Sequence, residues 1–145
     1  MSLFNLLSVS ASGMAVQRTR AEILVENMAN AETTRTPEGG PYKRRDVVFE
    51  SAPQQSPFQS VLMSEMSQAA NGVRVSEVVE DTRDPDKRYQ PGHPDADAAG
   101  YVAYPRMNPS EEMVDLISAT RGYQANVSAM SAVKDMIHRS IDMLR

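Results

Sequence analysis

The residues best suited to chemistry by type and spacing lie in the run His93-Pro94-Asp95-Ala96-Asp97. An imidazole and two carboxylates so close together could bind a divalent metal ion. Such a site would need further ligands, and the other histidine, His138, lies far along the chain. Proline after His93 favours an extended backbone, and the Asp-x-Asp spacing suits a turn closed by an aspartate side chain. We therefore interpret the run as a structural turn and expect no metal ligand there.

Two other charged clusters have equally simple explanations. Glu111 and Glu112 fall where a helix is expected to begin, and a helix N-terminus favours negative charge. The basic cluster Lys43-Arg44-Arg45 is followed by Asp46, and we predict that it is a solvated loop. The sequence contains no cysteine and no phosphate-binding glycine loop, HExxH or GxSxG motif. The chain is thus predicted to be no enzyme and to use no cofactor.

Composition and charge exclude several further classes of protein. A net charge of −4 gives no bulk attraction to nucleic acid or to an anionic membrane. No apolar run approaches the ~20 residues that span a bilayer, so we expect no direct membrane insertion. The N-terminus has no Lys or Arg before Arg18, which makes it a poor secretory signal. We expect a protein that is either cytoplasmic or exported without a cleaved signal peptide.

Both ends of the chain lack proline and carry a seven-residue repeat. All nine prolines lie between Pro37 and Pro109. The N-terminal repeat positions are Leu3, Leu7, Ser10, Met14, Gln17, Ala21, Leu24, Met28 and Ala31. The C-terminal positions are Met113, Leu116, Thr120, Tyr123, Val127, Met130, Lys134, Ile137, Ile141 and Leu144. This spacing is typical of coiled coils and predicts helices over residues 3–31 and 109–145.

Local signals refine these two helices. Asn108 can cap the second helix, with Pro109 at its first position and Glu111 at its third. Gly13 interrupts the first helix. It is either a flaw that costs about 1 kcal/mol or a point where a neighbouring helix approaches closely, and the sequence leaves both open.

The predicted fold is mainly α with a small β-rich middle. Long N- and C-terminal helices pair as a coiled coil, with a short antiparallel sheet and loops between them. We expect strands over 46–51, 73–79 and 100–105, loops over 51–60 and 82–94, and either a short helix or a strand over 61–68. This gives an N-terminal helix (1–34), a middle domain (35–107) and a C-terminal helix (108–145).

Several motifs together resemble a known family. The segments SGMAVQR (12–18) and NMANA (27–31) are similar to the signature of the bacterial flagellar axial proteins, which form the rod and hook. The segments GGPYKRR (39–45), HPDADAAGYV (93–102) and EMVDLISATRGYQANV (112–127) narrow the resemblance to the proximal rod members. The chain departs from the family pattern over Tyr104-Pro105-Arg106-Met107-Asn108, where an Asn-Val-Asn ending is usual.

The resemblance implies a structural subunit of the flagellar basal-body rod, the shaft that crosses the periplasm, transmits torque for motility and surrounds the export channel. It implies export through the flagellar type III apparatus, and helical assembly with copies of itself, the rod proteins FlgB and FlgF, and the adaptor FliE. The repeats and the motifs together predict an assembly interface formed by Leu3, Leu7, Met14, Gln17, Leu24, Asn27, Met28, Asn30, Met113, Leu116, Tyr123, Val127, Met130, Ile137, Ile141 and Leu144.

Two alternatives from other classes remain at this stage. The first is a cytoplasmic coiled-coil adaptor or chaperone, because coiled-coil helices alone do not specify a rod. The second is a small metal-dependent enzyme that uses His93 with Asp95 and Asp97.

Overall fold

The computed structural model describes residues 3–52 and 72–143 of the chain. The elements are α1 (Leu3–Ala29), β1 (Arg45–Ala52), β2 (Gly72–Glu80), β3 (Asp86–Tyr89), β4 (Tyr101–Tyr104) and α3 (Pro109–Asp142). The expected short helix or strand over 61–68, and most of the expected loop over 51–60, lie outside the described residues. Within these limits the chain is mainly α with a small amount of β structure.

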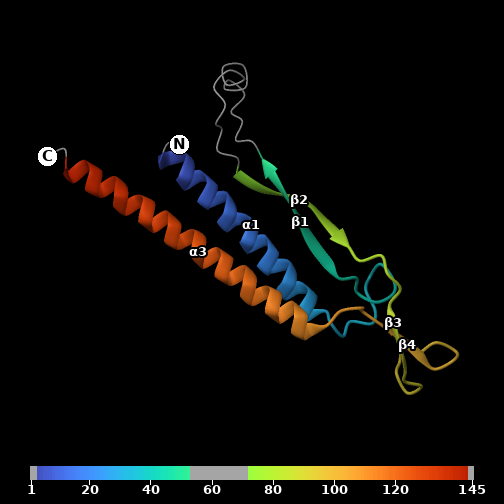
Figure 1. The fold of residues 1–145 in the computed structure, drawn as a ribbon. Helices are drawn as coiled ribbons and strands as arrows, with labels where there is room; N and C mark the ends of the chain where they lie inside the picture. The colour runs from blue at the N-terminus through green and yellow to red at the C-terminus, as the bar shows by residue number, and fades with distance from the viewer. Residues whose placement is uncertain (1–2, 53–71, 144–145) are drawn as a thin grey trace, which may run out of the picture.

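The two helices run antiparallel along the length of the molecule, and α1 lies between α3 and the β1–β2 hairpin (Figure 1). At 1.5 Å per residue, α1 is ~40 Å long and α3 ~51 Å. Buried side chains along α1 and α3 include Val16, Leu24, Ala119 and Val133. Neither helix, over the residues that the structure describes, is long and apolar enough to cross a membrane.

The α1–α3 contact does not follow the predicted repeat of α3 at every position. The residues of α3 that are buried are Glu112, Ala119 and Val133, which are themselves seven or fourteen apart. Leu116, Met130 and Ile137 of the predicted seam are half-buried beside them. The alternate seam residues Met113, Val127 and Ile141 are 55%, 43% and 54% exposed. Half of the predicted seam therefore lies outside the intramolecular contact, and coiled-coil pairing of the two helices along that seam is not confirmed.

Small residues let the two helices approach closely at two points. A Cβ atom added to Gly13 of α1 would lie 2.9 Å from Oδ1 of Asn126, and one added to Gly122 of α3 would lie 3.1 Å from Cδ of Gln17. Each glycine thus receives a long polar side chain from the opposite helix. This answers the question left open for Gly13: it marks a close approach of a neighbouring helix, here α3.

The start of α3 has the cap that the sequence predicts. Asn108 is its N-cap, and the Asn108 Oδ1 accepts a hydrogen bond of 3.0 Å from the backbone N–H of Ser110. Pro109 occupies the first helical position, and Glu111 accepts a 3.3 Å hydrogen bond from the Asn108 amide. The prediction of this helix start is confirmed.

The β structure forms two separate two-stranded antiparallel sheets, β1–β2 and β3–β4. The β1–β2 pair aligns Val47 with Val78 and has a bulge between Val48 and Phe49. The strands expected around 46–51, 73–79 and 100–105 are confirmed as β1, β2 and β4.

The expectation that all of residues 82–94 form a loop is wrong, because β3 lies within that range. Asp86–Tyr89 is exposed at every position and has no apolar alternation, so its sequence gives no strand signal. Its pairing with β4 provides the reason for the strand. The rings of Tyr89 and Tyr101 meet edge to face at 5.4 Å, and the Arg88 guanidinium lies 4.6 Å from the centre of the Tyr104 ring.

We expect Gly13→Val to lower the free energy of unfolding by about 2 kcal/mol, because the added side chain must displace Asn126 or separate the helices. Urea unfolding followed by circular dichroism measures the change. Adding Asn126→Ala should restore most of the loss, since it removes the side chain that the introduced isopropyl group would meet. A Gly13→Val variant as stable as the parent would show that the close approach does not exist.

Candidate functional site

The most tightly connected part of the molecule is a polar junction around Asn27, near the C-terminal end of α1. Its side chain is completely buried. The amide Nδ2 donates to the Arg45 carbonyl at 2.8 Å and to Glu112 Oε2 at 2.9 Å. The Oδ1 accepts from the Tyr42 hydroxyl at 3.1 Å and from the Arg45 N–H at 3.0 Å. All the hydrogen-bonding capacity of the Asn27 amide is used within the chain.

Glu112 joins this junction from the first turn of α3. It is only 2% exposed, and burial of an uncompensated carboxylate is costly. Compensation comes from two sides: Asn27 donates to Oε2, and Arg44 Nε donates to Oε1 at 2.5 Å. The position of Glu112 at a helix N-terminus adds favourable electrostatics. The junction therefore connects α1, the approach to β1 and the start of α3 through one buried charge pair.

The prediction that Lys43-Arg44-Arg45 is a solvated loop is wrong for its two arginines. The Arg44 side chain is 23% exposed and pairs with Glu112 and, at 3.3 Å, with Asp46. Arg45 begins β1 and is half-buried. The helix N-terminus alone, which the sequence suggested as the reason for Glu112, is therefore an incomplete explanation, because Glu112 also pairs with Arg44. A basic cluster three residues long gave no sign of a buried acid 68 positions away.

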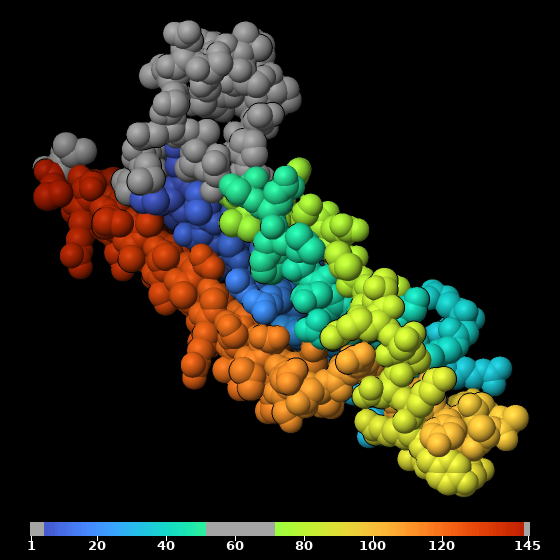
Figure 2. All heavy atoms as spheres, turned by 45° about the vertical axis from the view of Figure 1, so that its right-hand side comes forward, coloured from blue at the N-terminus to red at the C-terminus, as the bar shows by residue number. Residues whose placement is uncertain are grey.

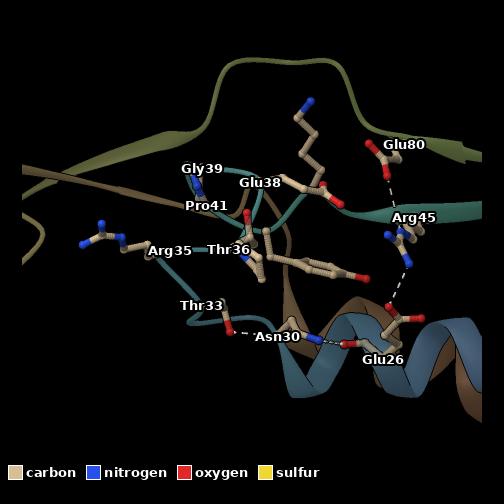
Figure 3. Close-up of a pocket in the computed structure, with 13 residues that line it drawn as sticks. Glu26, Asn30, Thr33, Arg35, Thr36, Glu38, Gly39, Pro41, Arg45 and Glu80 are labelled. Carbon is tan, nitrogen blue, oxygen red and sulfur yellow. Dashed lines mark hydrogen bonds and ion pairs between the residues drawn. The ribbon is translucent and has the colours of Figure 1, made fainter.

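Arg45 forms a second set of ion pairs on the rim of a polar pocket of about 370 Å³ (Figure 3). Its guanidinium lies 2.9 Å from Glu26 of α1 and 3.5 Å from Glu80 of β2. In Figure 3 it stands between these two carboxylates, with Asn30 and Thr33 further along the floor of the pocket. Arg45 thus binds the paired strands to α1, and its single positive charge is shared between the Glu26 and Glu80 carboxylates.

Asn30 serves as the polar end of α1. Its Nδ2 donates to the Glu26 carbonyl at 3.0 Å, and its Oδ1 accepts from the Thr33 hydroxyl at 3.2 Å. The first bond gives the Glu26 carbonyl a second donor beside the Asn30 N–H, and the second joins the side chains of the helix end and the following turn. The loop that follows is then directed toward Tyr42, whose N–H donates to the Thr33 carbonyl at 3.0 Å.

Burial of Tyr42 raises the pKa of its phenol above the ordinary value, and the nearby Glu26 carboxylate raises it further. Removing its proton would add a further negative charge to those of Glu26, Glu80 and Glu112, and it would cost the hydrogen bond that the hydroxyl donates to Asn27. The junction is thus built for a neutral tyrosine.

The His-Pro-Asp run forms a turn. Asp97 Oδ1 accepts from the N–H groups of Ala99 and Tyr101 at 2.9 and 2.8 Å, as the turn interpretation predicts. His93 Nδ1 accepts from the Asp95 N–H at 3.2 Å. Asp95 in turn accepts from the Thr34 hydroxyl at 2.8 Å, which fastens the turn to the loop after α1. In the described part of the chain no three metal-ligating side chains gather at one point.

The predicted assembly residues fall into groups of different exposure. Asn27 belongs to the junction and, like Leu24, is buried. The half-buried members are Leu7, Met14, Gln17, Met28, Asn30, Leu116, Met130 and Ile137. The exposed members are Met113, Tyr123, Val127 and Ile141. Leu144 and the side chain of Leu3 lie outside what the structure describes.

Comparison with known proteins decides the family. A family model described as flagellar basal body rod FlgEFG protein C-terminal matches residues 98–143. The flagellar basal-body rod protein FlgC of Bacillus subtilis is 43% identical over 150 residues, covering 99% of each chain. FlgC of Borreliella burgdorferi is 36% identical over 100% of this chain and 99% of its own, and FlgC of Salmonella typhimurium is 35% identical over 99% and 98%.

The chain belongs to the FlgC family of flagellar basal-body rod proteins.

The junction of this FlgC-family chain contains three residues that are not among the predicted assembly residues: Tyr42, Arg44 and Glu112. All three lie in segments that carried the resemblance, 39–45 and 112–127. The motif NMANA supplies Asn27. Three motifs that are separate in the sequence therefore meet at the junction. Their presence together in one chain was the sequence signal that could have indicated a shared site.

We expect Tyr42→Phe to cost about 1 kcal/mol of unfolding free energy at neutral pH, because one hydrogen bond to Asn27 is lost. The folded pKa of Tyr42 is raised above the unfolded value of about 10, so its contribution is complete below pH ~10 and is lost as the pH rises through the folded pKa. The stability difference between the parent and Tyr42→Phe should thus narrow at alkaline pH.

Urea unfolding between pH ~7 and pH ~11 measures this difference. Tyr89→Phe, at a side chain that is 66% exposed, is the matched control and should leave the unfolding free energy at neutral pH unchanged. A gap between the parent and Tyr42→Phe that stays constant over the whole range would contradict the account.

Proposed function

We propose that this chain is a structural subunit of the flagellar rod that assembles helically with other rod proteins into the shaft crossing the periplasm. The shaft transmits torque and surrounds the export channel. One observation carries the proposal beyond family membership: α3 has two apolar faces, and only one of them is used within the chain.

The unused face is an outer stripe of Met113, Ile117, Tyr123, Val127 and Ile141, which are all between 41% and 55% exposed. At ~100° per residue these side chains fall within ~120° of the helix circumference. Figure 2 shows α3 as an open flank of the molecule, with its outer side uncovered in that view. An extended apolar stripe of this kind is typical of a surface that other proteins cover.

A rod is the kind of assembly that suits such a stripe. The buried face of α3 is occupied by α1, so the outer stripe must meet a different surface on a neighbouring subunit. Contacts between unlike surfaces that do not close into a ring generate a helical tube. We expect the half-buried Leu116, Met130 and Ile137 to border the same interface.

Several finer features belong to this proposal. We infer that the neighbours include copies of this chain, FlgB, FlgF and the adaptor FliE, and that the chain reaches the periplasm through the flagellar type III apparatus without cleavage of a signal peptide. The function requires no catalysis, cofactor or metal. Family membership gives no support to a cytoplasmic adaptor or chaperone, and the residues considered for a metal-dependent enzyme are engaged in the His93–Asp97 turn.

The experiment places a charge on the outer stripe without disturbing the fold. Val127→Asp should reduce incorporation into basal bodies by at least about tenfold and abolish motility, because an unpaired carboxylate in a packed interface costs several kcal/mol. Ala125→Asp is the matched control: Ala125 is also exposed on α3 but lies ~160° away around the helix.

The readouts are the amount of each variant that co-purifies with basal bodies, and swimming in soft agar. Both variants should keep the circular dichroism spectrum of the parent, because neither position is buried within the chain. Normal incorporation and motility of Val127→Asp, or an equal defect in Ala125→Asp, would refute the assignment of the stripe as an assembly surface.

A further inference from the structure

Four cationic side chains from three distant segments gather around one small pocket, which we call the basic pocket. Its cations are Lys43 and Arg44 before β1, Arg83 between β2 and β3, and Arg106 between β4 and α3. The pocket has a volume of about 110 Å³. The chain as a whole is acidic, with a net charge of −4, so this concentration of positive charge is a local feature.

The positive charges of the basic pocket are only partly neutralised. Among the described residues that line it, Asp81 is the one acid, and Arg83 holds that carboxylate through contacts of 2.9 Å from Nε and 2.5 Å from Nη2. Arg44 is engaged by Glu112 and Asp46. Within the parts of the chain that the structure describes, no acid forms an ion pair with Lys43 or Arg106. Arg106 acts on Asp81 only through space, helping to lower its pKa. Lys43 and Arg106 are thus the two cations in the lining without an ion-pair partner among the described residues, and they can contact an external anion.

The Asp81–Arg83 ion pair, which is the neutralised part of the pocket, is held firmly in place. The Arg83 hydrogen bonds hold the pKa of Asp81 at about 2, so that carboxylate stays charged and bound to Arg83 at neutral pH. Asp81 also donates its N–H to the Arg44 carbonyl at 2.8 Å, which joins the end of β2 to the residue before β1. Pro41, Pro85 and the buried Tyr42 also line the pocket, with Gly39, and the two prolines restrict the backbone there.

We propose that the basic pocket binds an oxyanion, a carboxylate or a phosphate group, held chiefly by Arg106 and Lys43. A guanidinium presents planar paired donors that match the oxygens of both groups, and an ammonium adds a mobile point charge. The volume of about 110 Å³ accommodates one such group. Arg106 lies in the segment where the chain departs from the usual pattern of the flagellar family, whereas Lys43 and Arg44 belong to a segment that carries the resemblance.

The test is a titration of the full-length chain, labelled with ¹⁵N, followed by NMR of the arginine Nε–Hε groups at constant ionic strength. One arm uses inorganic phosphate and the other uses N-acetylglutamate as a probe for a protein carboxylate. We expect saturable shifts at Arg106 and Arg83 in at least one arm. Saturation by N-acetylglutamate points to an acidic side chain of a partner protein, and saturation by phosphate alone points to a free or esterified phosphate.

Variants locate the effect. Arg106→Ala and Lys43→Ala should each weaken the binding by about tenfold, which corresponds to the loss of one charged contact. Arg121→Ala is the matched control, because Arg121 is an exposed arginine of α3 that does not line the pocket, and the affinity of this variant should equal that of the parent. Lys43 is exposed, so its variant keeps the test valid even if Arg106→Ala is poorly folded. Linear shifts in both arms, or equal affinity in Lys43→Ala and the parent, would overturn the proposal.

Discussion

The Glu112 carboxylate is buried at the first turn of α3, and side chains from two other segments of the chain compensate its charge. A buried carboxylate is tolerated only when it is paired and hydrogen-bonded. Arg44 supplies the charge and Asn27 supplies a second donor. Arg44 lies just before β1, and Asn27 lies in α1. The need to pair the Glu112 carboxylate therefore fixes α1, the segment before β1 and the start of α3 relative to one another.

The consequences of this arrangement extend along both helices. Once Glu112 is held against Asn27, the antiparallel alignment of α1 and α3 brings Gly122 to Gln17 and Gly13 to Asn126. The face of α3 that begins at Glu112 is used for this contact, and the neighbouring face with Met113 and Val127 is left exposed. The junction thus decides which apolar face of α3 is covered within the chain, and the exposed face is the one that we propose for assembly. A rigid pair of helices, α1 and α3, with one exposed apolar face suits the proposed rod, which must transmit torque.

Much of this fold could be predicted from local signals in the sequence. The capped start of α3 follows from Asn108 and Pro109, and the two helices follow from the heptad repeats and the absence of proline. The strands β1, β2 and β4 follow from short runs of valine and tyrosine. The strand β3 could not, because its residues are exposed and become a strand only through pairing with β4. The heptad repeat located the helices but misplaced half of the contact, since periodicity does not show which of two adjacent apolar stripes a particular neighbour covers. The Arg44–Glu112 pair was missed because each residue had an adequate local explanation and only the tertiary fold brings them together.

A double-mutant cycle on Arg44 and Glu112 tests most directly whether this pair holds the segments together. Arg44→Ala, Glu112→Ala and the double variant are compared by urea unfolding. Either single change should lower the free energy of unfolding by about 3 kcal/mol or more, as expected when one partner of a buried pair is removed. The double variant should then be at least about 1.5 kcal/mol more stable than the sum of the single effects predicts. Additivity within about 0.5 kcal/mol would contradict the account, because it would mean that the two side chains stabilise the fold independently.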